Sequence, residues 1–274
     1  MNIGFIGAGR VGCSLGKYFI LHGFFVTGYY SHSCQSANKA SELTQSNVFD
    51  SPQDVVQNSD VIFITVPDGA IEEVWRSIKD LDYKGKTICH CSGAMSSEIF
   101  SEPDNSGGRC SFHPLLAVSS VSQDLGEAFF TIEGNETGLE TARKILNQCG
   151  NTYQEIDKTY KSRYHAAAAI ASNLVVGVLD MAVSMLTECG FDEEGARKAL
   201  TPLVTGNVAA VMERGAKAAL TGPVKRGDIE TVEKHLKLLS GNDYEIYRLL
   251  SLKLLEIAQL QNEPDYNKMK TILE

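Results

Sequence analysis

The stretch Ile3-Gly4-Phe5-Ile6-Gly7-Ala8-Gly9-Arg10-Val11-Gly12 decides the fold of the first half of this chain. A short apolar run leads into Gly-x-Gly-x-x-Gly, and an apolar helical pattern follows through Leu15 and Phe19. This order of strand, glycine turn and helix is typical of a dinucleotide site, in which the pyrophosphate lies at the helix N-terminus. We interpret Gly7 as the tight turn, Gly9 as the point where the backbone approaches the phosphates, and Gly12 as the contact between helix and strand. Ala8, Arg10 and Val11 complete the predicted cofactor-binding turn.

The composition narrows the class of protein. The chain has 274 residues, enough for two domains, and its 25 Lys and Arg against 34 Asp and Glu give a net charge of −9. Because nucleic-acid binding needs a basic surface, we expect no nucleic-acid partner. The seven cysteines contain no Cys-x-x-Cys pair, so we predict neither a metal site nor a disulfide framework. The first strand begins at the N-terminus, and no run of 18 apolar residues is evident, so we expect a cytoplasmic protein without a membrane span.

The second predicted strand, residues 24–30, bears on the choice of cofactor. In NAD enzymes an acidic residue at the end of this strand binds the ribose hydroxyls. Here the strand is followed by Ser31-His32-Ser33, and the first acidic residue of the chain is Glu42. Hydroxyl and imidazole donors without a carboxylate favour the 2′-phosphate of NADP. The serines could also cap the helix predicted over residues 34–44.

Several further strands are expected in the first half. Residues 60–68 form a continuous apolar run of the kind that is buried in parallel sheets, and Val66 and Pro67 end it at the edge where ligands lie. Residues 86–91 form the next strand, and Ser92 and Gly93 follow at the same edge. We predict that Asp68 caps the helix over residues 70–80. Strands over 109–112, 129–133 and 153–156, with a helix over 137–149, complete a mostly parallel sheet domain of residues 1–157.

Two histidines, His90 and His113, lie at the ends of predicted strands. A histidine is often structural, yet imidazole titrates near neutral pH and can donate a proton to a substrate. We regard His113 as the better candidate for the active cleft.

Residues 158–274 are predicted to be all helical. In the first helix of this half, ideal helical periodicity places His165, Ala169, Ser172, Asn173, Val176 and Asp180 on one arc. Polar side chains that are buried without a partner cost about 1–3 kcal/mol each, so this arc should face a ligand or bond to another helix. A loop near residue 225 carries Lys225 and Arg226 in a Gly-Pro frame, where they could bind an anionic substrate group or remain solvated. The apolar helical half predicts a homodimer core.

The chain resembles a large group of two-domain reductases that join an N-terminal Rossmann domain to a helical C-terminal domain, including pyrroline-5-carboxylate reductase, β-hydroxyacid dehydrogenases and prephenate dehydrogenase. Within this group it is similar to the family whose second half is the domain of unknown function DUF2520. The resemblance rests on residues 7–12, 61–68, 90–93, 112–115, 164–166 with 172–173, and 219–223 with 226–228. It implies an NADP-dependent oxidoreductase, a dimer, and a cleft in which His113, His165 and Asn173 converge. β-Hydroxyacid dehydrogenases carry a catalytic Lys followed four residues later by Asn, whereas here Lys161 is followed by His165, so that mechanism does not carry over.

These features predict hydride transfer between NADPH and a small C=O or C=N substrate. The nicotinamide would lie over Pro67 and the Ser92-Gly93 turn, His165 or His113 would donate the proton, and Asn173 would orient the substrate. A non-catalytic NADP-binding sensor or regulatory dimer is the alternative, because a glycine turn does not require chemistry. A reduced deazaflavin as hydride source follows from the resemblance alone.

Overall fold

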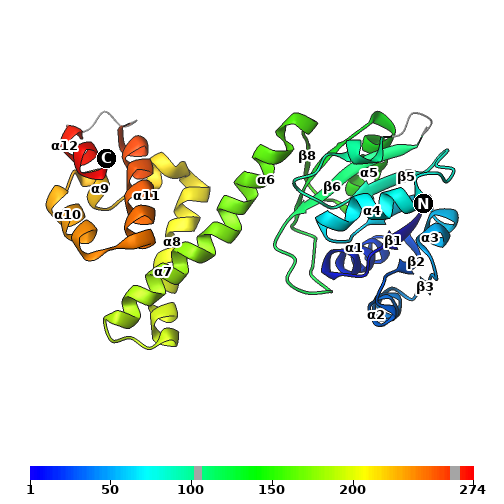
Figure 1. The fold of residues 1–274 in the computed structure, drawn as a ribbon, viewed down its shortest axis with the longest axis horizontal. Helices are drawn as coiled ribbons and strands as arrows, with labels where there is room; N and C mark the ends of the chain where they lie inside the picture. Colours follow the sequence, from blue (N-terminus) through cyan, green and yellow to red (C-terminus); the bar gives the residue numbers. More distant parts are fainter. Residues whose placement is uncertain (102–106, 260–265) are drawn as a thin grey trace. The chain divides into compact units, whose positions relative to one another are not determined.

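The computed structural model describes residues 1–101, 107–259 and 266–274. Its first part is a sheet with the strand order β3-β2-β1-β4-β5-β6-β7-β8, drawn in blue to green in Figure 1. Every neighbouring pair is parallel except β6 and β7. The strands are β1 Asn2–Ile6, β2 Phe25–Tyr30, β3 Asn47–Val48, β4 Val61–Ile64, β5 Thr87–His90, β6 Gly108–Leu115, β7 Phe129–Gly134 and β8 Tyr153–Glu155. The predicted mostly parallel α/β sheet is confirmed.

Helices connect these strands in the way that parallel pairing requires. They are α1 Arg10–Leu21, α2 Cys34–Thr44, α3 Pro52–Asn58, α4 Asp68–Ile78 and α5 Glu136–Cys149, with the short 3₁₀ turns η1 Ser97–Phe100 and η2 Lys158–Tyr160. The sequence analysis missed β3 and α3. The start of α3 has a readable signal, because Ser51 caps it by accepting a hydrogen bond from the Asp54 backbone N–H and Pro52 occupies its first turn.

The core of this part lies on both faces of the sheet, as predicted from the continuous apolar strands. Along β4, Phe63 packs into an aromatic cluster on one face with Phe5 and Phe112. Its neighbours Ile62 and Ile64 point to the opposite face, where Trp75 and Phe100 are buried. Successive side chains of a strand therefore fill two separate cores.

The chain divides into two compact units, residues 1–173 and 174–274. We call the first the sheet domain and the second the helical unit. The division falls 173 − 157 = 16 residues after the predicted boundary, because helix α6, Lys161–Ala169, packs with the sheet domain. The helical unit contains α7 Val175–Glu188, α8 Glu193–Ala219, α9 Pro223–Arg226, α10 Ile229–Leu238, α11 Gly241–Gln259 and α12 Asn267–Leu273, and no strand among its described residues.

Two helix predictions in this half need correction. A π-helical turn, Ile170–Leu174, separates α6 from α7, so the residues before and after it do not keep the spacing of an ideal α-helix. The arc predicted from His165 to Asp180 is therefore wrong as one continuous face. The predicted loop near residue 225 contains the short helix α9. Asp228 caps the next helix, α10, by accepting from the Thr231 backbone N–H at 3.1 Å.

The expectation that no segment is long and apolar enough for a membrane span is wrong. Among the described residues, the helical stretch Lys158–Glu188 passes by length and composition, and none of its most apolar window is buried within the chain. Residues 164–179 within this stretch contain no Lys, Arg, Asp or Glu.

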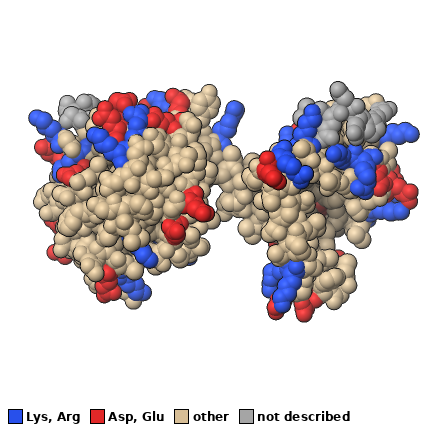
Figure 2. Space-filling view, turned by 180° about the vertical axis from the view of Figure 1, so that it is seen from behind, with Lys and Arg blue, Asp and Glu red and all other residues tan. Residues whose placement is uncertain are grey.

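The helical unit has a small core of its own, built on α9 to α12 around Val232, Leu255 and Met269. In contrast, α7 has no buried residue and α8 buries only Ala196. Figure 2 shows an area of this unit without charged side chains, between charged groups at its ends. Its exposed large apolar side chains are Leu174, Val175, Val176, Val178, Phe191, Leu203, Val208, Val211, Met212, Leu238, Ile246, Leu249, Leu250 and Leu254.

Candidate functional site

The glycine turn between β1 and α1 adopts a backbone that requires glycine. Gly7 has φ +110°, and a Cβ there would lie 2.7 Å from the Thr65 carbonyl carbon. A Cβ on Gly12 would lie 2.4 Å from Thr65 Oγ1 and 2.7 Å from the Gly7 carbonyl oxygen. Thr65 Oγ1 itself donates to that carbonyl at 2.8 Å. The sequence analysis did not single out Thr65, although it directly follows β4 and lies between the two glycines.

The remaining glycine, Gly9, is open. It is the N-cap of α1, no side chain caps this helix, and the nearest atom to a Cβ at Gly9 would be 3.9 Å away. Unpaired N–H groups at a helix N-terminus attract phosphate. Arg10 is exposed at the first position of α1, while Val11 packs partly against the core. The turn therefore leaves space and unpaired N–H groups where a pyrophosphate would bind.

A cavity of about 550 Å³ lies beside the turn. Seven of the predicted cofactor residues line it, namely Gly7, Ala8, Gly9, Ser31, His32, Val66 and Pro67. It also includes Ser36 and Gln53, which the sequence analysis missed. The other six predicted cofactor residues do not line it, namely Arg10, Val11, Gly12, Ser33, Ser92 and Gly93. Of the described residues that line it, Glu73 is the single acidic one, and Glu73 comes from α4 rather than from the end of β2.

The serines after β2 organise the start of α2. Ser33 Oγ accepts from the Ser36 backbone N–H at 3.3 Å and is the N-cap of α2. Ser31 Oγ accepts from the Ser33 backbone N–H at 3.4 Å. The capping interpretation thus holds for Ser33, whereas Ser31 and His32 line the cavity.

A second cluster lies at the end of β5, centred on Ser92. Ser92 Oγ donates to Asp68 Oδ2 at 2.7 Å and accepts from the backbone N–H groups of Ala94 and Met95. The predicted capping role of Asp68 is wrong, because Pro67 is the N-cap of α4 and no side chain caps the helix. The carboxylate of Asp68 instead holds the turn that follows β5.

The side chains of His113 and His165, the two predicted proton donors, both lie beside Gly93. A Cβ built on Gly93 would lie 2.9 Å from His165 Cδ2 and 3.0 Å from His113 Nε2. His113 lies within β6, not after it as predicted, because the strand continues to Leu115. His165 extends from α6, 52 residues later (165 − 113). A glycine at position 93 is thus needed to let both imidazoles approach the turn.

Tyr164 fixes the ring of His113. The Tyr164 hydroxyl lies 2.7 Å from His113 Nδ1. Burial, followed by the charge of Lys161, lowers the pKa of His113 to about 4, so the imidazole is neutral at pH 7. Burial raises the pKa of Tyr164, so its hydroxyl keeps its proton and can donate to Nδ1. With Tyr164 as the donor, the hydrogen of neutral His113 lies on Nε2, the atom beside Gly93.

His90 is a structural residue beneath this cluster. It is fully buried, and its Nδ1 accepts from the Ser92 backbone N–H at 3.2 Å. Burial, followed by the charge of Lys161, lowers its pKa to about 4. Its neutral, buried ring therefore supports the turn that follows β5.

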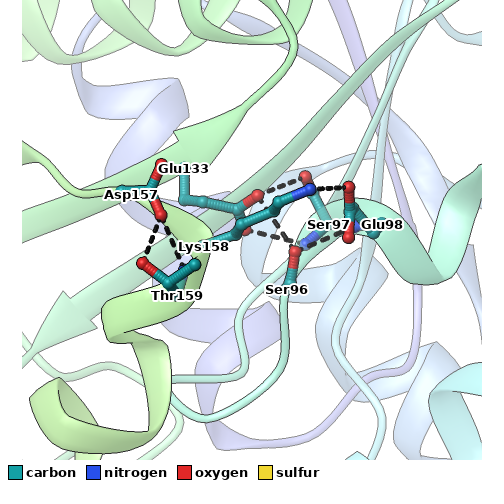
Figure 3. Close-up of polar contacts among 7 residues, drawn as sticks. All are labelled: Ser96, Ser97, Glu98, Glu133, Asp157, Lys158 and Thr159. Atoms are coloured by element: carbon teal, nitrogen blue, oxygen red, sulfur yellow. Dashed lines mark hydrogen bonds and ion pairs between the residues drawn. The ribbon is translucent and has the colours of Figure 1, made fainter.

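Figure 3 shows how the loop after Gly93 is anchored to the sheet. The buried carboxylate of Glu133 on β7 accepts from the Ser97 backbone N–H at 2.8 Å, Ser97 Oγ at 2.9 Å and Ser96 Oγ at 3.1 Å. Beside it, Lys158 of η2 forms an ion pair with Glu98 of η1. The same loop therefore carries Gly93 and fastens the segment that leads into α6.

The remaining predicted site residues lie outside these two clusters. The Asn173 side chain accepts a hydrogen bond from Ser172 Oγ at 3.0 Å, and both residues are exposed within this chain. Lys225 and Arg226 lie on α9 of the helical unit, where Lys225 lines a hollow of about 490 Å³ with Arg214, Lys217 and Ala218. In the described part of the chain, no group of three His, Cys, Asp or Glu is placed to hold a metal ion.

The fold and the glycine turn define a nucleotide-binding protein of the Rossmann class with a helical second part. Comparison with family models refines this class. A Rossmann-like domain matches residues 1–114, and the domain of unknown function DUF2520 matches residues 128–254. The chain belongs to the family that joins these two domains, and the predicted resemblance is confirmed.

Solved structures share the fold over nearly the whole length. Protein TM1727 from Thermotoga maritima has 28% identity and a TM-score of 0.77, covering 95% of this chain and 100% of that chain. A putative NADP oxidoreductase, BF3122 from Bacteroides fragilis, has 22% identity and a TM-score of 0.75, covering 93% and 98%. The pyrroline carboxylate reductase of Plasmodium falciparum with NADP bound has 17% identity and a TM-score of 0.65, covering 95% and 96%. No curated protein matches the chain.

Proposed function

We propose that this protein is an NADP-dependent oxidoreductase that transfers a hydride between NADPH and a small substrate with a C=O or C=N bond. The observation that carries the proposal is the pairing of His113 and His165 over Gly93, at the sheet edge where the glycine turn also lies. Hydride transfer to such a bond needs a nicotinamide and a group that supplies a proton to the other atom. Structural neighbours of low identity are described as NADP oxidoreductases and imine reductases, which supports the same class.

The cofactor would bind along the cavity beside the glycine turn. Ser31, His32 and Ser36 offer neutral donors for the 2′-phosphate, and no acidic residue follows β2 before Glu42. The pyrophosphate would meet the open N-terminus of α1 at Gly9. When bound, NADPH would supply the hydride, and Pro67 and the Ser92-Gly93 turn would hold its nicotinamide ring.

Among the site residues, His165 is the better proton donor. His113 is neutral at pH 7 because of its lowered pKa, so its Nε2–H serves as a hydrogen-bond donor to the substrate atom that receives the proton. His165 is exposed within this chain, and its ring nitrogens form no hydrogen bond to the residues that the structure describes. Asn173 would orient the substrate, and Lys225 or Arg226 would bind an anionic group on it.

We also propose a cytoplasmic homodimer that forms through the helical unit. Seven large apolar side chains of α7 and α8 are exposed within this chain, and groups of exposed apolar side chains often mark contact surfaces. A second copy explains this exposure better than a lipid bilayer, because the stretch Lys158–Glu188 begins with η2 and α6, whose Lys161 and Tyr164 are held by hydrogen bonds to the sheet domain.

NADPH binding and turnover test the proposal in separate measurements. We expect NADPH to bind more tightly than NADH in a fluorescence titration, and one member of a panel of imines, keto acids and aldehydes to be reduced. His165→Ala should lower kcat by about 10²–10⁴-fold and leave the Kd for NADPH near the wild-type value. His235→Ala, which removes an exposed histidine on α10, is the matched control and should keep full activity.

Three results would contradict parts of this proposal. No NADPH binding would overturn it entirely. Tight binding without oxidation over the whole panel would identify a non-catalytic sensor. Unchanged turnover in His165→Ala would remove the role of His165.

A further inference from the structure

Lys161, the first residue of α6, is buried although lysine is rarely so. Its side chain reaches across to the sheet, where Nζ donates to Ser111 Oγ at 2.7 Å and to the Ser92 carbonyl oxygen at 3.1 Å. Ser111 lies on β6, two residues before His113, and its Oγ donates in turn to the Ser92 carbonyl at 3.2 Å. One ammonium group therefore joins α6, β6 and the turn after β5.

These contacts fix the point where the histidines meet. Ser92 is held from below by His90 and from the side by Asp68, and Lys161 holds its carbonyl. Gly93 follows directly, with His113 Nε2 and His165 Cδ2 beside it. Loss of the Lys161 bonds would leave the Ser92 carbonyl and Ser111 hydroxyl with one partner fewer each, so the turn would lose a fixed position relative to β6.

The charge of Lys161 also acts on His113. The groups around the His113 ring are Lys161, Tyr164 and His165 from α6, Asp68 from α4, His90 from β5 and Thr131, its register partner on β7. Of these, Lys161 and, to a smaller extent, His165 oppose protonation of the imidazole, whereas the carboxylate of Asp68 favours it. Burial of the ring is the larger cause and the charge of Lys161 is the second, and together they lower the pKa of His113 to about 4.

We propose that Lys161 is a positioning residue of this site: its ammonium holds the Ser92-Gly93 turn against β6 and opposes a second positive charge on His113. The proposal deepens the proposed function and rests on it for the statement that a substrate binds there. His113 then works as a neutral hydrogen-bond donor at Nε2, which leaves proton donation to His165. Lys161 does not touch the substrate in this arrangement, since both of its hydrogen bonds to Ser92 and Ser111 point into the protein.

The test is an NMR titration of the His113 imidazole in the full chain, with its signal assigned by its loss in His113→Asn. In the wild type we expect His113 to stay neutral down to about pH 5. In Lys161→Met we expect the midpoint to rise by about one pH unit or more, because a nearby like charge is removed. Lys161→Arg should keep the low midpoint. Lys158→Met is the matched control, since Lys158 lies three residues earlier in an exposed ion pair and should leave the midpoint unchanged.

A wild-type midpoint above pH 6 would overturn the proposal, and this measurement needs no variant to fold. A midpoint in Lys161→Met equal to the wild type would overturn it too. The titration uses neither NADPH nor substrate, so its result does not depend on the proposed function. The proposed function fails separately, if NADPH does not bind. If both hold, Lys161→Met should also move the acidic limb of the kcat/KM profile upward in pH, a change that a purely structural loss of activity would not produce.

Discussion

The sheet domain buries two cores of large apolar side chains within its own chain, whereas α7 of the helical unit buries no residue within this chain. Phe5, Phe63 and Phe112 are fully buried in the first, while Val176 and Leu203 of the second are 67% and 61% exposed. The same contrast holds for glycines. In the sheet domain, a Cβ on Gly138 would meet the Arg109 carbonyl oxygen at 2.2 Å, but a Cβ on Gly177 of α7 would meet nothing within 4 Å. Gly138 is thus enclosed by its own chain, whereas Gly177 is open within this chain.

The largest effect that we expect in the sheet domain comes from His90. Its pKa is about 4 in the folded chain, against 6.5 for a histidine in an unfolded chain, so the unfolded chain takes up a proton first as the pH falls. The contribution of His90 to the free energy of unfolding is therefore complete above pH 6.5 and is lost between pH 6.5 and 4, by roughly 3 kcal/mol. Denaturant unfolding at several pH values should show this fall, and His90→Gln should reduce it. His113 acts in the same direction, so the double variant should reduce it further. An unchanged slope in His90→Gln would contradict the assignment.

The different surroundings of Gly138 and Gly177 predict that Gly→Ala lowers the free energy of unfolding at the first and raises it at the second. Gly138→Ala must move α5 away from the β6 backbone, and overpacking of this kind costs about 1–3 kcal/mol. Gly177→Ala meets open space in α7 and should gain about 1 kcal/mol through helix propensity. Thermal unfolding of both variants measures the difference. A loss of stability in Gly177→Ala would show that a second chain lies against that residue.

The smallest of the three effects concerns association. Val176→Glu places a charge on the exposed apolar surface of α7 and should weaken the proposed homodimer about tenfold or more, which light scattering over a dilution series measures. Leu21→Glu is the matched control, because Leu21 is 72% exposed on α1 of the sheet domain. If both variants keep the wild-type mass at all concentrations, α7 is not the dimer surface.

The sheet domain was largely predictable because its signals are local. Residues 3–12 specify the first strand, turn and helix, and each of these is found where the sequence predicted it. The apolar run at residues 61–64 predicted a strand buried on both faces, and its side chains do point alternately into the two cores. What failed there was the prediction for Asp68, since helix-capping residues are recognised by sequence position, whereas its actual partner Ser92 lies 24 residues away.

At the histidine cluster beside Gly93, even more of the contacts join residues that are far apart in the sequence. The sequence indicated His113 and His165 separately, but their meeting over Gly93 depends on how α6 packs against β6. From the sequence, Lys161 is noted only as the position of the catalytic Lys in β-hydroxyacid dehydrogenases, and Tyr164 only as part of the resemblance. Neither is assigned a role in the site from the sequence. Only their burial and their hydrogen bonds to β6 and the Ser92 turn distinguish them.

By itself, the sequence determined the class of fold, the place of the dinucleotide turn and the absence of an acidic residue after β2. These properties depend on backbone conformations and residue types within about ten neighbours. The tertiary structure decided which polar groups face one another: Ser92 with Asp68 and Lys161, His113 with Tyr164, and both histidines with Gly93. Such pairs join residues far apart in the chain, and their protonation follows from burial, which no local pattern specifies.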